Sequence, residues 1–328
     1  MPEQFAAFVA TKDDDTVHRE VRQWARDDLG DGDVIIRVAY SSVNYKDGLA
    51  TIAKGQVARV SPLIPGIDLA GTVVESTSDE FTAGDHVLAH GYALGVAHHG
   101  GYAQFARVPA DWVVPLDALS ARDAMTIGTA GFTAAMSVQR IQDRGITPQD
   151  GPVLVTGASG GVGSVGVDLL AGQGYDVVAS TGDTSAHDWL RERGASEIID
   201  RLDTDDIRPL GKHRWAAAVD CLGGAPLAAI LSTLSIGGIV AASGNTAGLS
   251  LETTVAPFIL RGVTLAGIDS ANLAIDERRA LWARLADDLR PSVLEASDEV
   301  GLDQLEDTLD AILDARTRGR ILVRLDHD

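Results

Sequence analysis

The stretch from Val153 to Gly163, which reads VLVTGASGGVG, places the strongest constraint on the fold of this chain. A short apolar, β-branched run leads into a glycine-rich turn, and apolar residues then recur at helical spacing as far as Leu170. A second strand-like run, Asp176 to Ser180, follows almost at once. Strand, glycine turn, helix and strand of this length predict one βαβ unit of the kind that binds a dinucleotide.

The glycines of this turn have a chemical reason. A pyrophosphate approaches the backbone too closely for a Cβ, and the first turn of a helix offers it free N–H groups and a positive dipole end. A third glycine allows the helix to pack tightly on the strand. We therefore expect the phosphates of a coenzyme to bind at Ser159, Gly160, Gly161, Val162 and Gly163.

The remaining patterns divide the chain of 328 residues into two parts, each long enough to form a domain. Short strand-like runs separated by glycine turns cover the N-terminal part and predict a small, partly open β-barrel. From residue 151 onward, strand-like and helical runs alternate. Six strands with intervening helices predict an α/β domain with a doubly wound parallel sheet. A last strand-like segment, Gly319–Leu325, is expected to return to the barrel.

The net charge of −20 excludes partners that require a basic surface. Nucleic acids and anionic membranes bind clustered Lys and Arg, so neither is expected as a partner. No apolar run is long enough to cross a bilayer, and the first residues lack a signal-peptide pattern. The single cysteine, Cys221, suits a reducing compartment. These features predict a cytoplasmic protein that acts on a small molecule.

Four further segments resemble one group of enzymes. They read SSVNYKD (41–47), PGIDLAG (65–71), GTAGFTA (128–134) and PFILRGV (257–263). Together they resemble the acrylyl-CoA reductase family, a zinc-free, quinone-oxidoreductase-like branch of the medium-chain dehydrogenase/reductase superfamily, over essentially the whole chain. The resemblance implies a GroES-like catalytic domain at residues 1–124 and 295–328 and a Rossmann domain at 125–294. It also implies a homodimer, joined through the strand edge at 262–267.

Cys and His are missing from the two segments that carry the zinc ligands in zinc-dependent members of that superfamily. Those members need a Cys at the first position and a Gly-His-Glu segment, where this chain has VNYKD (43–47) and PGID (65–68). Zinc requires three or four well-placed N, S or O ligands, so no metal is expected. Without a Lewis acid to polarise an alkoxide, hydride addition to an activated C=C bond is favoured over alcohol oxidation.

The resemblance implies an NADPH-dependent reductase of activated C=C bonds that converts acrylyl-CoA to propionyl-CoA. Hydride would reach the β carbon, and a proton would reach the α carbon. Two alternatives stay open at this point. One is an NAD(P)H-dependent quinone or enone reductase on the same scaffold, and the other is a non-catalytic NADPH-binding protein.

The resemblance places Asn44 and Tyr45 beside the nicotinamide as the catalytic residues. Asn44 is expected to hydrogen-bond the coenzyme or the acyl carbonyl. Tyr45 is expected to contact the coenzyme and to position the substrate or deliver the proton to the α carbon, unless it is only a packing aromatic. Lys54 and Arg59 are expected to bind the acyl-CoA, and the alternative is that both are solvated surface charges.

Further coenzyme contacts are expected along the helix that joins the two domains and at the carboxyl ends of the later strands. The helix contributes Thr129 and Thr133 by resemblance, although both also fit as ordinary polar residues of a helix. Ligands of doubly wound sheets bind at the carboxyl edge. There the chain offers Ser243, Gly244, Ile268 and Ser270.

The end of the second strand of the βαβ unit bears on the choice between NADP and NAD. An acidic residue there accepts from the ribose hydroxyls and repels a 2′-phosphate. This chain has Ser180, Thr181 and Gly182, followed by Asp183 where the resembling family has Arg. The hydroxyls suit a phosphate, and Arg201 after the third strand supplies positive charge. We expect NADPH, with NADH left possible by the carboxylate.

Overall fold

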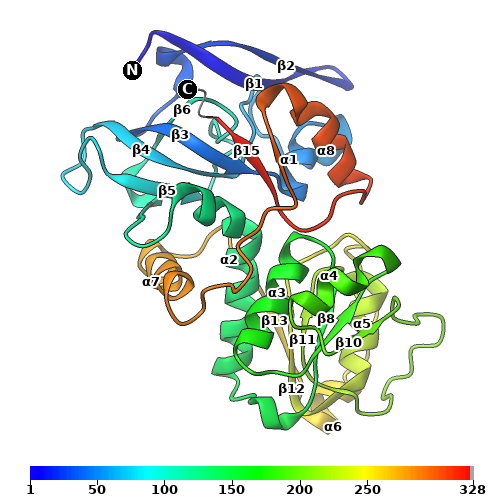
Figure 1. The fold of residues 1–328 in the computed structure, drawn as a ribbon. Coiled ribbons are helices and arrows are strands. Elements are labelled where there is room, and N and C mark those ends of the chain that lie inside the picture. The colour runs from blue at the N-terminus through cyan, green and yellow to red at the C-terminus, as the bar shows by residue number, and fades with distance from the viewer. Residues whose placement is uncertain (326–328) are drawn as a thin grey trace. The chain divides into compact units, whose positions relative to one another are not determined.

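The computed structural model describes residues 1–325, and these form two compact units (Figure 1). The first unit comprises Met1–Thr129, Ala271–Ala286 and the chain from Leu294 onward, and the second comprises Ala130–Ser270 and Asp287–Val293. These units differ from the expected domains chiefly in helix α7 (Ile275–Ala286), which belongs to the first unit. The reason is tertiary: Trp282 and Arg278 of α7 both hydrogen-bond to the buried His90.

The second unit is built on six parallel strands in the spatial order β10-β9-β8-β11-β12-β13, which confirms the doubly wound sheet. All residues of β8, β9 and β11 are buried, as expected for parallel strands covered on both faces. The strands are β8 (Val153–Thr156), β9 (Val177–Ser180), β10 (Glu197–Ile199), β11 (Trp215–Asp220), β12 (Leu234–Ala242) and β13 (Thr264–Gly267).

Helices connect these strands, and Figure 1 shows several of them beside the sheet. They are α3 (Gly161–Gly172), α4 (His187–Glu192), α5 (Gly224–Thr233) and α6 (Ala256–Arg261), with short 3-10 turns η4 (Pro148–Asp150) and η5 (Thr184–Ala186). Helix α2 (Ala121–Asp143) contributes its later residues to this unit. It is kinked at Gly128, where φ is 53° and a Cβ would lie 2.5 Å from Arg320 Nη2. Only glycine fits this position.

The first unit contains a seven-stranded sheet in the order β14-β15-β3-β4-β5-β7, with β6 also paired to β3, and a separate β1–β2 hairpin. The path has two ends, β14 and β7, so the described strands do not form a closed barrel. The strands are β1 (Gln4–Asp13), β2 (Thr16–Ala25), β3 (Val34–Ser42), β4 (Asp68–Ser76), β5 (His86–His90), β6 (Phe105–Val108), β7 (Val113–Pro115), β14 (Asp298–Val300) and β15 (Ile321–Arg324).

The first unit also contains α1 (Tyr45–Ala50) and α8 (Leu305–Leu313), together with α7 and the first residues of α2. Four 3-10 turns also belong to it, namely η1 (Arg26–Leu29), η2 (Ala53–Gly55), η3 (Ala110–Trp112) and η6 (Leu302–Gln304). Strand β15 pairs antiparallel with β3, Leu322 opposite Ser42, which confirms the expected return of the tail to the barrel.

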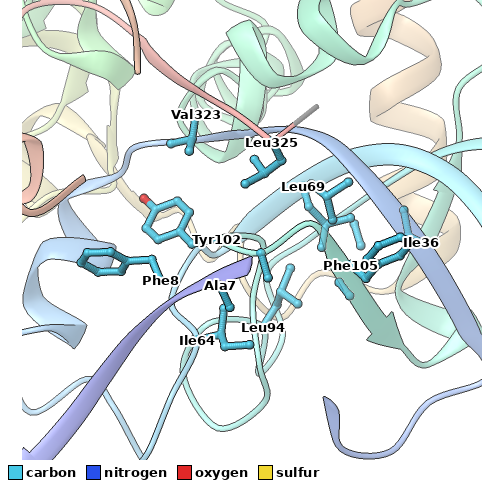
Figure 2. Packing of buried hydrophobic residues seen from close by; sticks show 14 of the residues in the cluster. Ala7, Phe8, Ile36, Ile64, Leu69, Leu94, Tyr102, Phe105, Val323 and Leu325 are labelled. Carbon is cyan, nitrogen blue, oxygen red and sulfur yellow. The ribbon is translucent and has the colours of Figure 1, made fainter. Parts of the chain in front are cut away.

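The core of the first unit brings together side chains from distant parts of the chain. Figure 2 shows Ala7 and Phe8 of β1, Leu69 of β4 and Val323 of β15 around the same interior as Tyr102. Tyr102 is fully buried, and its hydroxyl donates to the Ser42 carbonyl oxygen at 3.2 Å. A polar group thus enters this apolar core with its hydrogen bond satisfied. No helix found in residues 1–325 combines the length and apolarity needed to cross a bilayer.

Candidate active site

The glycine turn after β8 forms a cradle that side chains would fill. Gly157 has φ of 58°, in the left-handed region, and a Cβ on Gly163 would lie 2.3 Å from the Gly157 carbonyl oxygen. Helix α3 begins at Gly161, and Gly160 before it has no side chain to cap the first turn. The N–H groups of that turn are therefore open to an anion, which fits the pyrophosphate of a dinucleotide.

The carboxyl ends of β12 and β13 carry the expected residues in tight backbone contacts. Ser243 N donates to the Asp220 carbonyl oxygen at 2.9 Å, and a Cβ on Gly244 would lie only 1.8 Å from the Cys221 carbonyl oxygen. Ile268 N donates to the Ala242 carbonyl oxygen at 3.0 Å. The structure thus places all three residues at one edge of the sheet, the edge where doubly wound folds bind ligands.

Two expected coenzyme contacts from distant segments meet in the second unit. Thr133 Oγ1 on α2 donates to Ser270 Oγ at 2.8 Å. Thr129, by contrast, lies in the first unit, where its backbone N–H and its hydroxyl each donate to an Asp68 oxygen at 2.9 Å. The two threonines therefore have different local surroundings, although they are one helical turn apart.

The hydroxyls at the end of β9 are bound within the protein. Ser180 is 2% exposed, and its Oγ donates to the Asp200 carbonyl oxygen at 3.0 Å. Thr181 Oγ1 shares a hydrogen bond of 3.0 Å with Ser159 Oγ in the glycine turn. These hydroxyls join neighbouring segments of the edge, a role that the sequence pattern does not reveal.

In the first unit, Asn44 and Asp47 close the turn that begins α1. Asn44 N donates to Asp47 Oδ2 at 2.9 Å, and Ile67 N donates to Asp47 Oδ1 at 2.9 Å. Both carboxylate oxygens are thus used to hold backbone groups. Tyr45 is the first residue of α1 and is 36% exposed, and its hydroxyl makes no hydrogen bond within residues 1–325.

Asp68 is the centre of a buried polar network that sequence reasoning missed. Its carboxylate accepts from the backbone N–H and hydroxyl of Ser42, from Asn44 Nδ2 at 3.0 Å, and from both donors of Thr129. Arg320 Nη2 donates to Ser42 Oγ at 2.6 Å, and its Nη1 lies 3.4 Å from Asn44 Oδ1. The Asn44 amide is therefore directed inward at both ends.

Burial, followed by nearby charges, shifts the pKa values of three members of this network. Burial raises the pKa of Asp47 from 3.8 to about 7, and the Asp68 carboxylate adds to the effect. Burial likewise raises the pKa of Tyr102 well above its ordinary value and lowers that of Arg320. Two buried carboxylates face one guanidinium, so a proton on Asp47 near neutrality keeps the cluster close to charge balance.

The two expected substrate cations follow α1 in the chain. Lys54 lies in η2 and is exposed. Arg59 is also exposed, and its backbone N–H donates to the Val96 carbonyl oxygen at 2.8 Å. Neither side chain forms an ion pair within residues 1–325. Both are therefore available to an anionic ligand.

Comparisons with known proteins agree with both units. Residues 30–118 match the alcohol dehydrogenase GroES-like domain, and residues 161–287 match the zinc-binding dehydrogenase family. The Bacillus subtilis (strain 168) protein YhfP, grouped by name with the quinone oxidoreductases, is 49% identical over 98% of this chain and 99% of its own length. Acrylyl-CoA reductase AcuI of Ruegeria pomeroyi is 45% identical over 97% of this chain and 98% of its own.

Solved structures extend this likeness to the whole fold. The yhdH oxidoreductase of Salmonella enterica, in complex with NADP, superposes with a TM-score of 0.95 at 45% identity and covers 98% of this chain and 100% of that chain. The structure of B. subtilis yhfP with NAD bound has a TM-score of 0.96 at 49% identity, over 99% and 100% of the two chains. The GroES-like and Rossmann architecture expected from the sequence is thereby confirmed.

The name of the second matching family raises the question of zinc. Within residues 1–325, no group of three or more His, Cys, Asp or Glu side chains is arranged to hold a metal ion. At the turn where zinc-dependent members carry their ligands, the Asp68 carboxylate is occupied by donors from Ser42, Asn44 and Thr129. These residues do not fit a catalytic zinc site.

Proposed function

The chain belongs to the medium-chain dehydrogenase/reductase superfamily, and on this premise we propose that it reduces an activated C=C bond with NADPH, acrylyl-CoA giving propionyl-CoA. The reaction adds one hydride at the β carbon and one proton at the α carbon. A nicotinamide coenzyme supplies the hydride when bound. The protein must then hold the acceptor, stabilise the charge that develops on the thioester oxygen, and provide the proton.

The Asn44–Tyr45 turn is the observation that carries this proposal. Its backbone is fixed by Asp47 and by the Asp68 network, whereas Tyr45 is 36% exposed and its hydroxyl makes no hydrogen bond within residues 1–325. A phenol on a rigid turn can orient an acyl group and donate a proton to it. In this proposal Tyr45 is the catalytic acid, and Asn44 positions it from the buried side.

The coenzyme is proposed to bind to the second unit. The cradle at Gly157, Gly160 and Gly163 suits the pyrophosphate, and the residues at the carboxyl ends of β12 and β13 suit the nicotinamide half. Relatives solved with NADP and with NAD are 45% and 49% identical to this chain, which supports a nicotinamide dinucleotide as the ligand. NADPH is the proposed physiological form.

The thioester is proposed to reach the protein through its CoA moiety. Lys54 and Arg59 are exposed cations without an ion pair in residues 1–325, on the segment that directly follows α1. Phosphate groups bind such side chains through charge-assisted hydrogen bonds. This supports an acyl-CoA over an uncharged enone, and AcuI of R. pomeroyi is a relative named for that substrate.

The decisive assay follows oxidation of the reduced coenzyme by purified protein, with acrylyl-CoA as acceptor and with NADPH and NADH in parallel. We expect rapid turnover with a preference for NADPH. Arg59→Glu should raise KM for acrylyl-CoA and leave KM for NADPH unchanged. If the protein turns over a simple quinone or enone but not acrylyl-CoA, the substrate assignment is overturned. The protein would then be a quinone or enone reductase, the activity for which YhfP is named. Tight NADPH binding with no turnover on any acceptor would favour a non-catalytic protein.

We further propose a cytoplasmic homodimer. β13 lies at the edge of the six-stranded sheet, and the helix before it, α6, exposes Ile259 and Leu260 by 73% and 64%. An unpaired edge beside exposed apolar side chains favours association with a second copy. Light scattering after size exclusion should show twice the mass of one chain, and Ile259→Asp should shift the protein towards the monomer. A wild-type monomer at high concentration would disprove the dimer.

A further inference from the structure

Asp183 follows β9 at the place where acidic residues select NAD, yet its carboxylate is bound within its own turn. Asp183 Oδ1 accepts from the Ser185 backbone N–H at 3.0 Å and from Ser185 Oγ at 2.6 Å. Its backbone N–H donates to Thr181 Oγ1 at 3.1 Å. Asp183 is therefore the N-cap residue of the 3-10 turn η5, and its carboxylate accepts a hydrogen bond from the first turn.

Arg201 supplies the opposite charge at the same edge. It follows β10, the strand that pairs with β9, and its guanidinium lies against the backbone of Gly182. A Cβ on Gly182 would lie 2.5 Å from Arg201 Nε, so the arginine occupies the space that glycine leaves. The Arg201 side chain is exposed and makes no hydrogen bond or ion pair within residues 1–325.

The neighbouring hydroxyls do not compete for this role. Ser180 Oγ is buried and donates to the Asp200 carbonyl oxygen, and Thr181 Oγ1 is shared between Ser159 and the Asp183 backbone. Arg201 and Asp183 are two oppositely charged groups at this edge, and they act in opposite directions on a ribose and on a 2′-phosphate. The Arg201 side chain makes no hydrogen bond or ion pair within residues 1–325, whereas the Asp183 carboxylate is held by Ser185.

We propose that Ser185 is a specificity-determining residue: by binding the Asp183 carboxylate, it lets a chain with an acidic residue at this position accept NADPH. The proposal rests on the proposed function, because it concerns the coenzyme of that reaction. Held by Ser185, Asp183 Oδ1 has two of its acceptor directions filled and cannot readily turn to the ribose hydroxyls. Arg201 then binds the 2′-phosphate without direct competition from the carboxylate.

Two relatives of this chain have been solved with different coenzymes. At 45% and 49% identity to this chain, one solved structure holds NADP and the other holds NAD. The fold is therefore compatible with both coenzymes, and local side chains must set the preference. In this chain the restraint on Asp183 is one such local feature.

The test is equilibrium binding rather than turnover. Dissociation constants for NADPH and NADH, and for adenosine 2′,5′-bisphosphate and 5′-AMP as probes without the nicotinamide, would be measured by calorimetry. In Ser185→Ala the carboxylate loses the hydroxyl of residue 185 and keeps the backbone N–H. The less restrained carboxylate should repel the 2′-phosphate and accept from the ribose. The ratio of the NADPH to the NADH dissociation constant should rise by about fivefold or more, since one charge-assisted hydrogen bond is lost.

Two further variants make the result specific. Adding Asp183→Asn to Ser185→Ala removes the charge and should restore the wild-type ratio. Thr184→Ala removes a neighbouring exposed hydroxyl that makes no hydrogen bond within residues 1–325 and should leave the ratio unchanged. An unchanged ratio in Ser185→Ala would overturn the inference even if the enzyme reduces acrylyl-CoA. A shifted ratio in a protein that reduces no acceptor would support the inference while the proposed function fails.

Discussion

Asn44 and Asp68 are joined by a hydrogen bond of 3.0 Å from Asn44 Nδ2 to the Asp68 carboxylate, inside the first unit. The same carboxylate orders Ser42 and Thr129, and Arg320 reaches Ser42 and Asn44 from the tail of the chain. The turn that presents Tyr45 is thus supported from three segments far apart in sequence. This arrangement fixes the backbone from which the half-buried Tyr45 side chain projects.

Replacement of Asp68 by Asn should remove this support. The amide cannot accept all the hydrogen bonds that reach the carboxylate, and the buried Arg320 would lose its nearby opposite charge. We expect a loss of about 3–5 kcal/mol in the free energy of unfolding, measured by urea denaturation. Asp314→Asn removes a carboxylate from the exposed pair with Arg316 and should cost less than about 1 kcal/mol. Equal losses in the two variants would contradict the role of Asp68.

Asp47 should make stability depend on pH in a defined direction. Its pKa is raised from 3.8 to about 7 in the folded protein, so between about pH 4 and pH 7 the folded state holds a proton that the unfolded state has released. The free energy of unfolding should therefore fall as the pH rises through this range and level off above it. The slope due to this group is at most about 1.4 kcal/mol per pH unit.

Asp47→Asn tests this assignment. The variant should be less stable overall, because its amide nitrogen would face a backbone N–H, but it should lose the part of the slope between about pH 4 and pH 7. Urea unfolding at several pH values measures both quantities. Wild type and variant with parallel profiles would show that another group is responsible.

Local pattern explains which parts of the molecule could be predicted. The strand run of β8, the glycines after it and the periodicity of α3 lie within about twenty residues, and they were enough to predict the nucleotide cradle. The partners of Asp68 could not be predicted in the same way, because Arg320 is 252 residues away and polar residues of the interior have no periodic pattern. Helix α7 lies within the expected Rossmann residues 125–294 but groups with the first unit, and its contact with His90 has no signal in the local sequence because it is tertiary.

The direction of a side chain is equally hidden from the sequence. Ser180 and Thr181 have the residue types that suit a phosphate, yet their hydroxyls bind Asp200 and Ser159. Whether a Ser or Thr hydroxyl faces a ligand depends on the carbonyl and hydroxyl groups that other segments place beside it. The PGID segment contains neither Cys nor His, and nothing in its local sequence marks Asp68 as the centre of a buried network.

Two glycines of α3 provide a matched pair for the nucleotide cradle. Gly163→Ala would place a Cβ 2.3 Å from the Gly157 carbonyl oxygen, so the turn must shift, and NADPH binding should weaken by about tenfold or more. Gly172→Ala, on the same helix, meets no atom within 4 Å and should stabilise the protein by about 0.4–1 kcal/mol. Calorimetric titration and thermal melting measure these effects. Unaltered NADPH affinity in Gly163→Ala would place the phosphates elsewhere.

Tyr45→Phe isolates the proposed proton donor. The phenol has no hydrogen bond to lose within residues 1–325, so the free energy of unfolding should stay within about 0.5 kcal/mol of wild type. Turnover of acrylyl-CoA should nevertheless fall at least several-fold, because the charge developing at the α carbon would have to be protonated by water. Binding of NADPH should be nearly unchanged.

Tyr175→Phe is the opposite control for that variant. The Tyr175 hydroxyl donates to the Ile146 carbonyl oxygen at 2.7 Å in the second unit, so its loss should cost about 1 kcal/mol of stability and leave kcat unaffected. We expect Tyr175→Phe to lose stability but keep turnover, and Tyr45→Phe to lose turnover but keep stability. This pair of results would show that the Tyr45 hydroxyl acts in the reaction and not in folding. If Tyr45→Phe turns over at the wild-type rate, the proton must come from solvent or another group. Tyr45 would then line the acyl site without donating a proton.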